Sequence, residues 1–323
     1  MRAPGRSPEE VARLYETAIE MAAYVDGQGE CQGIAVSEHH ASDDGFLPSP
    51  IVMASAIAAV TKRTPIAIAA ALLPLYDPVR LAEEMIVLDH ISRGRAIFTL
   101  GIGYRPDEYE LHGVEYRRRG AIADEKLEIL LQHLRAASSG DAAVRVTPAP
   151  FTAGGPMVTW GGTTPKAAQR AARFGLGFLS QSFDATLAPA YEQACKDAGT
   201  EPFFCYLPPA DSPNSVFVHD DLEQGWSDVG SALLADAMPY YAWNEAAGLA
   251  AKTVSLDSAK SVEELRAANG SHRVVTTDEA VGLIHKFGAL GLQPLCGGLD
   301  PDLAWTYLRR VVDDVLPAAA PGA

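Results

Sequence analysis

Short apolar runs alternate with helix-forming segments along almost the whole chain. Examples of these runs are residues 33–37, 64–73, 95–100 and 157–160. Each has the length of a strand, and nearly continuous apolar residues are typical of strands that are covered on both faces. Amphipathic segments such as residues 118–138 separate the runs. This alternation indicates a parallel sheet flanked by helices.

The number of runs indicates a barrel that is one strand short. Residues 176–180, 203–207 and 292–295 are three further runs, which makes about seven expected strands. An α/β barrel has eight parallel strands in about 250 residues. The chain opens on a helix, whose start is marked by a capping box between Ser7 and Glu10. We therefore expect a (β/α)8 TIM barrel that lacks its first strand, either because the barrel is open or because this sequence starts late.

No composition shift or internal repeat divides the chain. We expect one domain over residues 1–323, since α/β barrels of this size fold as single domains. Residues from about 211 to 270 have the least clear pattern and are predicted to form a helical extension of the barrel.

Composition excludes several classes of function. The chain has 41 acidic and 26 basic residues, a net charge of −15, which argues against nucleic acid or an anionic membrane as its main partner. Its most apolar stretches, residues 51–60 and 66–76, are shorter than the about 20 residues of a membrane span. The four cysteines form no C-x-x-C pair, so we expect no metal site built on cysteines and a reduced, cytoplasmic protein.

A cluster of ionisable residues follows the run 33–37. Glu38, His39 and His40 lie where a strand of an α/β barrel delivers catalytic groups. One imidazole pointing into the barrel mouth could act as acid or base, since its ordinary pKa near 6.5 suits proton transfer. Two alternatives stay open: a loop held by hydrogen bonds alone, and a metal site completed by Asp43 or Asp44.

Small residues lie at the ends of three other predicted strands. Gly161, Gly162, Thr163 and Thr164 precede a helix start at Pro165, a pattern that favours phosphate binding because such starts have free N–H groups. Alanines at 69–71 and glycines at 101 and 103 would let a flat ligand approach the backbone. Ordinary packing and capping explain each of these patterns as well.

Taken together, five stretches resemble the bacterial luciferase-like, flavin-dependent monooxygenase family. They read SEHHASDDGFLPSP, LLPLYDPVRLAEEMIVLDHISRGRAIFTLGIGY, DEYELHGVEYRRRG, PMVTWGGTTPKAAQRAARFG and LCGGLDPDLAWTYLRRVVDDVLP. The resemblance implies a reduced flavin at the barrel mouth, with His39 catalytic and Glu38 and His40 in support. It further implies a non-proline cis peptide at Ala69–Ala70 and a flavin phosphate at Gly162, Thr163 and Thr164, with Gly101 and Gly161 also at the cofactor.

Three functions are compatible with this resemblance. The favoured one is a monooxygenase that uses reduced FMN and oxygen on a small organic substrate, with a separate flavin reductase and as a homodimer. A second is an oxidoreductase that uses the deazaflavin coenzyme. A third is a non-catalytic flavin-binding or partner subunit. No residue pattern identifies the substrate.

Overall fold

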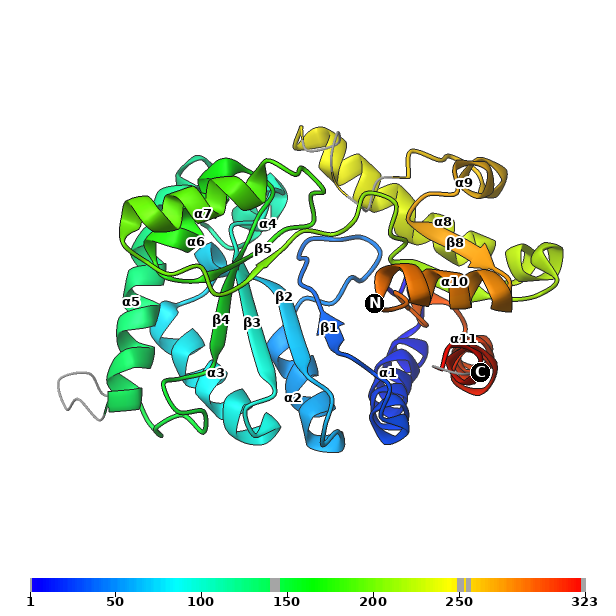
Figure 1. Cartoon of the computed structure of the whole chain (residues 1–323), viewed down its shortest axis with the longest axis horizontal. Helices are drawn as coiled ribbons and strands as arrows, with labels where there is room; N and C mark the ends of the chain where they lie inside the picture. Colours follow the sequence, from blue (N-terminus) through cyan, green and yellow to red (C-terminus); the bar gives the residue numbers. More distant parts are fainter. Residues whose placement is uncertain (1, 140–145, 249–252, 254–256, 321–323) are drawn as a thin grey trace.

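The computed structural model describes residues 2–139, 146–248, 253 and 257–320. Its main layer is a curled sheet of six parallel strands in sequence order, and a separate pair of parallel strands lies beside it (Figure 1). The six are β1 (Ile34–Val36), β2 (Ile66–Leu72), β3 (Ala96–Gly101), β4 (Met157–Gly161), β5 (Gly177–Leu179) and β6 (Cys205–Tyr206); the pair is β7 (Ser215–Val218) and β8 (His272–Val275). This is the predicted α/β architecture of an incomplete barrel.

Helices flank the curled sheet and the β7–β8 pair (Figure 1). They are α1 (Pro8–Gln28), α2 (Pro50–Val60), α3 (Pro78–Ser92), α4 (Pro106–Leu111), α5 (Arg119–Ser139), α6 (Pro165–Arg173), α7 (Leu187–Ala198), α8 (Leu222–Ala246), α9 (Val262–Ala268), α10 (Thr277–Phe287), α11 (Pro301–Arg310) and α12 (Leu316–Ala319). Short helical turns are η1 (Leu73–Leu75), η2 (Tyr116–Arg118), η4 (Cys296–Gly298) and η5 (Val311–Val315). None of these helices combines the length and hydrophobicity that a membrane crossing requires.

Local capping explains where several helices begin. The Ser7 side chain accepts the N–H of Glu10, whose carboxylate accepts the N–H of Ser7 in return. Thr276 and Glu279 form the same box at α10. The first of these caps was predicted from the sequence, and each occupies backbone N–H groups that a helix start leaves without partners.

The main core lies between the sheet and its helices. Ile66 and Ile68 on β2, Phe98 on β3 and Met85 on α3 are all fully buried. Burying one such side chain contributes about 1.5–3 kcal/mol. Inside the curl, the Thr159 hydroxyl donates to the Thr99 hydroxyl over 2.9 Å, so polar groups there pair across β3 and β4.

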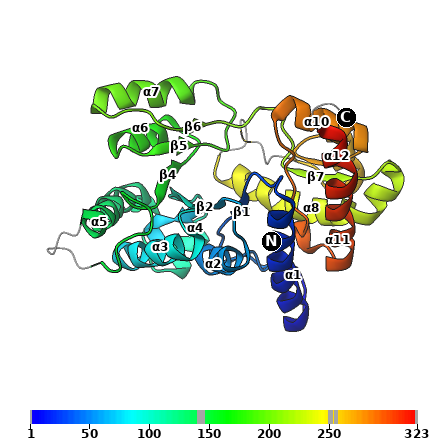
Figure 2. The same cartoon turned by 60° about the horizontal axis from the view of Figure 1, so that its bottom comes forward.

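The N-terminal segment lies at the edge where a first strand would pair. Within residues 2–33 the structure contains no strand, as predicted. The Ala3 N–H donates to the carbonyl of Asp44, and a Cβ added to Gly298 would meet Pro4 at 2.9 Å. This segment therefore connects the loop after β1 with η4. Figure 2 shows α1 beside α11, next to the same edge.

Three strand assignments differ from the sequence prediction. Residues 292–295 form no strand, so that prediction is wrong. The last strand is β8, which pairs with β7, and both were missed. Each is only four residues long and begins with a buried polar residue, Ser215 or His272, so neither has a clear apolar run. The segment from about 211 to 270 thus supplies β7 as well as the predicted helices.

Candidate functional site

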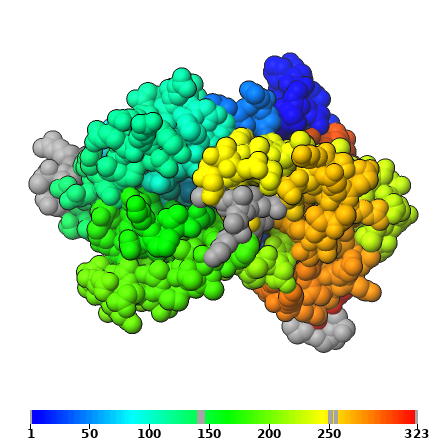
Figure 3. Space-filling model, turned by 90° about the horizontal axis from the view of Figure 1, so that it is seen from above, coloured from blue at the N-terminus to red at the C-terminus, as the bar shows by residue number. Residues whose placement is uncertain are grey.

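The ionisable residues gather at the C-terminal ends of β1, β2 and β3. Glu38 and His39 follow β1, Leu72 ends β2, and α4 begins five residues after Gly101. Viewed from above, α8 (yellow) crosses the middle of this face, between the cyan-to-green part and the orange part (Figure 3). The site therefore lies at the mouth of the curled sheet, under α8.

His39 points into the protein and pairs with a residue of α4. His39 is 8% exposed, and its Nδ1 lies 2.9 Å from Oε1 of the fully buried Glu108. The same oxygen accepts the backbone N–H of His40 over 3.1 Å. Because Oε1 acts as an acceptor here, Nδ1 of His39 is the donor, which leaves Nε2 without the proton in the neutral ring.

Glu38 supports His40 and the end of β2. Its Oε1 lies 2.6 Å from Nε2 of His40, and its Oε2 accepts the Leu72 N–H and the Tyr76 hydroxyl. Burial, reinforced by this carboxylate, raises the pKa of Tyr76, which keeps its hydroxyl a donor. Glu38 was expected to support His39, but among the described residues Glu108 holds His39, and Glu38 holds its neighbour His40.

Arg105 fastens the histidine loop to α4. Its guanidinium donates to the carbonyls of His40 and Ala41 over 2.9 and 3.0 Å and pairs with Asp107. The guanidinium carbon also lies 4.1 Å from the ring centroid of Trp243 on α8. This one side chain therefore links the loop, α4 and α8.

Tyr104 and three further aromatic rings lie around His39, and we call those three, Phe46, Tyr240 and Trp243, the aromatic box. Their centroids lie 4.8, 5.9 and 4.8 Å from the imidazole. Tyr240 and Trp243 both come from α8. Burial raises the pKa of Tyr240, so its hydroxyl stays neutral. The box surrounds the imidazole with apolar surface and restricts water around it.

Small residues form a floor beside these groups. The Ala69–Ala70 peptide bond is cis, where the resemblance implied it. A Cβ added to Gly101 would lie 3.3 Å from Cβ of Ala70, and one added to Gly161 would lie 3.8 Å from it. Ala70, Gly101 and Gly161 thus lie together on three adjacent strands, with room for a planar group only because they are small.

The start of α6 has the features of an anion site beyond that floor. Thr164 caps the helix by accepting the Ala167 N–H, and a Cβ on Gly162 would lie 2.4 Å from Cβ of Ala167. In the described part of the chain, the N–H groups of Thr163 and Thr164 donate to no acceptor. Free amides at a helix start fit a phosphate. The floor and this site together fit a flavin nucleotide.

The structure does not assemble the metal site considered from the sequence. Asp44 pairs with Arg2 and Ser42, and Asp43 is exposed. Away from His39, ligand atoms of Asp236, His272 and Cys296 lie within 4.8 Å of one another. Arg2 and Asp257 already bind the first two of these three, so the cluster is a network of ion pairs.

Sequence reasoning missed Glu108, Arg105 and the box residues of α8. Loop carboxylates such as those of Asp107 and Glu108 are usually solvated, so their presence alone does not indicate a site. Their position shortly after the third strand was a usable signal, since residues there reach the same mouth as those after β1. Tyr240 and Trp243 had no such signal.

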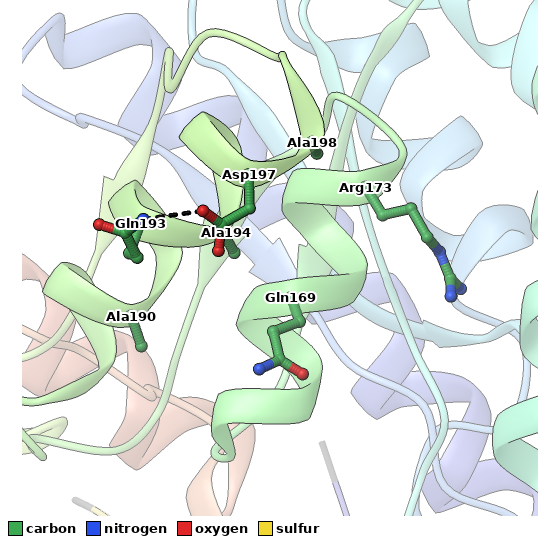
Figure 4. Close-up of a pocket in the computed structure, with 7 residues that line it drawn as sticks. All are labelled: Gln169, Arg173, Ala190, Gln193, Ala194, Asp197 and Ala198. Carbon is green, nitrogen blue, oxygen red and sulfur yellow. Dashed lines mark hydrogen bonds between the residues drawn. The ribbon is translucent and has the colours of Figure 1, made fainter.

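A shallow groove lies elsewhere, between α6 and α7. It is lined by Gln169 and Arg173 of α6 and by Ala190, Gln193 and Asp197 of α7, with the Arg173 side chain pointing away from α7 (Figure 4). Gln193 and Asp197 bond to each other over 2.8 Å. The groove is on the outer helical layer and does not contact the residues around His39.

Comparison with known proteins gives a family match over most of the chain. The model of the luciferase-like monooxygenase family matches residues 5–282. Limonene 1,2-monooxygenase of Rhodococcus erythropolis is 30% identical over 97 residues, which are 30% of this chain and 25% of that protein. The alkanal monooxygenase alpha chain of Photorhabdus luminescens is 28% identical over 154 residues, 44% of this chain and 41% of that one. Matched stretches span less than half of the length of such curated relatives.

Solved structures share the fold over nearly the whole chain. Monooxygenase RslO1 from Streptomyces bottropensis has a TM-score of 0.72 and 22% identity, covering 98% of both chains. The oxygenating constituent of 3,6-diketocamphane monooxygenase from Pseudomonas putida, in complex with FMN, has a TM-score of 0.69 and 20% identity, covering 98% and 96%. An F420-dependent secondary alcohol dehydrogenase has a TM-score of 0.62 and 15% identity, covering 95% and 96%.

Proposed function

Since the chain belongs to the luciferase-like monooxygenase family, we propose that it is a flavin-dependent monooxygenase that uses reduced FMN and oxygen on a small organic substrate. One observation carries this proposal: the buried His39–Glu108 pair lies at the same strand ends as the floor of Ala70, Gly101 and Gly161. A proton-transfer group beside a flat, small-residue surface is what flavin chemistry requires of a protein.

The cofactor would be held at two places. Ala69, Ala70, Gly101 and Gly161 would lie under its ring system, and Gly162, Thr163 and Thr164 would bind its phosphate. When bound, reduced FMN supplies the electrons that activate oxygen. Limonene and alkanal monooxygenases, which resemble parts of this chain, are named for oxygen insertion.

The chain itself would manage protons and water. Glu108 holds Nδ1 of His39, so that Nε2 can accept a proton and return it. Glu38 and His40 hold the end of β2 and the histidine loop in position beside the His39 ring. The aromatic box limits water near Nε2, which protects reactive species from hydrolysis.

The direct test combines cofactor titration with labelled oxygen. We expect the purified protein to bind reduced FMN and, with an added flavin reductase, to incorporate isotopically labelled oxygen into a member of a panel of small neutral substrates. His39→Ala should lower turnover by about 100-fold or more. His285→Ala, an exposed histidine on α10, is the matched control. Equal turnover of His39→Ala and the control would remove His39 from the mechanism.

A deazaflavin-dependent oxidoreductase is the second candidate. The fold is shared with an F420-dependent secondary alcohol dehydrogenase, and a buried imidazole–carboxylate pair also suits proton removal from an alcohol. Titration with the reduced deazaflavin coenzyme beside FMN separates the two: tight binding of the deazaflavin alone would replace the first proposal. Binding of FMN without turnover on any substrate would favour a non-catalytic partner subunit.

We propose a homodimer formed through the outer face of α2 and α3. The eleven residues of α2 include no charged side chain, yet Val52 is 69% exposed. Val60 on the same helix, and Val87 and Ile91 on the neighbouring α3, are exposed as well. With a net charge of −15, two copies repel each other least where the surface carries little net charge, as on α2, or where its charges are paired, as Arg80 and Glu84 are on α3.

A further inference from the structure

Arg2 is a buried arginine whose guanidinium contacts all three rings of the aromatic box. It is 1% exposed, and its guanidinium carbon lies 4.8 Å from the ring of Phe46, 4.6 Å from Tyr240 and 5.0 Å from Trp243. Each of these three rings also contacts His39. Arg2 and His39 therefore pack against the same three rings, although 37 positions separate them in the sequence.

Two of the three nitrogen groups of Arg2 are already engaged. Nε donates to Asp236 over 2.6 Å, and Nη1 pairs with Asp44. Nη2 is buried and has no acceptor within the described residues. A buried N–H group without a partner costs about 1–3 kcal/mol, so a ligand oxygen that reaches Nη2 would recover this energy.

The surrounding charges decide which kind of oxygen fits. Asp44 and Asp236 both pair with Arg2, so two carboxylates face one guanidinium. His272 lies between Asp236 and Asp257, so it adds one cation and brings in a third carboxylate, that of Asp257. The set carries three carboxylates against Arg2 and His272, so a second anion would be repelled. A neutral hydrogen-bond acceptor with an apolar body can accept from Nη2 and also pack against the three rings.

We propose that Arg2 selects a neutral carbonyl compound, such as a small ketone, as the substrate. This inference rests on the proposed monooxygenase function and names its substrate class. The carbonyl oxygen accepts from Nη2 of Arg2 while the apolar body lies among Phe46, Tyr240 and Trp243. Because these rings also touch one another, with 5.6 Å between the Tyr240 and Trp243 centroids, the ligand displaces a ring on binding. Tyr240 and Trp243 are both only partly buried, and movement of Trp243 can be followed by its fluorescence.

The test uses an isosteric pair that differs only in the acceptor. Cyclohexanone and methylenecyclohexane are titrated into the flavin-free protein, with binding followed by the fluorescence of Trp243 and assigned with Trp243→Phe. We expect the ketone to bind about tenfold more tightly or better, the effect of one hydrogen bond to a charged group. In Arg2→Met the ratio of the two affinities should fall to about one. Arg13→Met, at an exposed arginine paired with Asp302, is the matched control and should keep the wild-type ratio.

Four outcomes would overturn the proposal. They are equal binding of the two compounds by the wild type, an unchanged preference in Arg2→Met, binding of cyclohexanecarboxylate as tight as that of the ketone, and a loss of FMN affinity in Arg2→Met without any change in ketone preference. The last would mean that Nη2 serves a flavin carbonyl instead. If Arg2→Met does not fold, Arg2→Lys removes Nη2 while keeping the charge, and the wild-type comparison stands by itself. Ketone preference without turnover would count against the monooxygenase and not against this site.

Discussion

Nδ1 of His39 and Oε1 of Glu108 lie 2.9 Å apart, although 69 residues separate them in the sequence. The carboxylate oxygen also accepts the His40 N–H and lies 3.6 Å from Arg105. Its second oxygen, Oε2, is buried without a donor in the described residues. Glu108 thus orients the imidazole and has one oxygen left to accept a proton from a ligand.

Replacing Glu108 with Gln should reduce turnover by about 10–100-fold, in the range of a lost proton-transfer group. The amide keeps the size of the side chain but can present its NH2 group to Nδ1, which would favour the wrong tautomer. Steady-state kinetics across pH would show a lower kcat with little change in cofactor affinity. Glu110→Gln, exposed on the same helix, should match the wild type. Full activity of Glu108→Gln would contradict this role.

Filling the floor should impair cofactor binding without unfolding the chain. Gly101→Val places its side chain against Cβ of Ala70, which already lies 3.3 Å from the position of a Cβ. We expect reduced FMN to bind at least about tenfold more weakly, a loss of about 1.4 kcal/mol. Fluorescence titration measures it, and Gly27→Ala on α1, where a Cβ meets nothing within 4 Å, is the control. An unchanged affinity for reduced FMN would mean that the flavin ring binds elsewhere.

The ion-pair network at β8 should make stability depend on pH. Burial lowers the pKa of His272, but the hydrogen bonds and charges of Asp236 and Asp257 outweigh it, so the pKa lies above its ordinary value of 6.5. The stabilisation is therefore fully present below about pH 6.5 and is lost as the pH rises through the raised pKa. Denaturant unfolding at several pH values should show the free energy of unfolding falling over that window.

The matched variant is His272→Gln, which cannot titrate. It should be less stable than the wild type at low pH, and the difference should shrink as the pH rises. Parallel curves for the two proteins would show that His272 stays neutral in the folded state.

Val52→Asp should break the proposed dimer. It places a charge in the middle of the uncharged face of α2, where two copies would bring like charges together. Sedimentation should show monomer for this variant and dimer for the wild type, at the same protein concentration. Glu30→Asp, an exposed change outside this face, should leave the dimer intact. A dimeric Val52→Asp would locate the interface on another surface.

Much of the framework could be read from the sequence, because it depends on near neighbours. The helix starts at Ser7, Asp77 and Thr276 were predictable, since each cap is made within three residues along the chain. The six strands of the curled sheet were predicted from runs of apolar residues. β7 and β8 escaped because their first residues, Ser215 and His272, are polar groups that only the folded protein buries.

The residue pattern by itself determined an α/β barrel without its first strand, a histidine loop after β1 and small residues at the ends of three strands. Only the tertiary structure decided what surrounds His39. Glu108, Arg2 and Trp243 come from α4, the N-terminal segment and α8, and no local pattern marks them. The physical reason is that a buried polar side chain must find its partner wherever the fold brings one, so such pairs are set by packing across the chain and not by spacing along it.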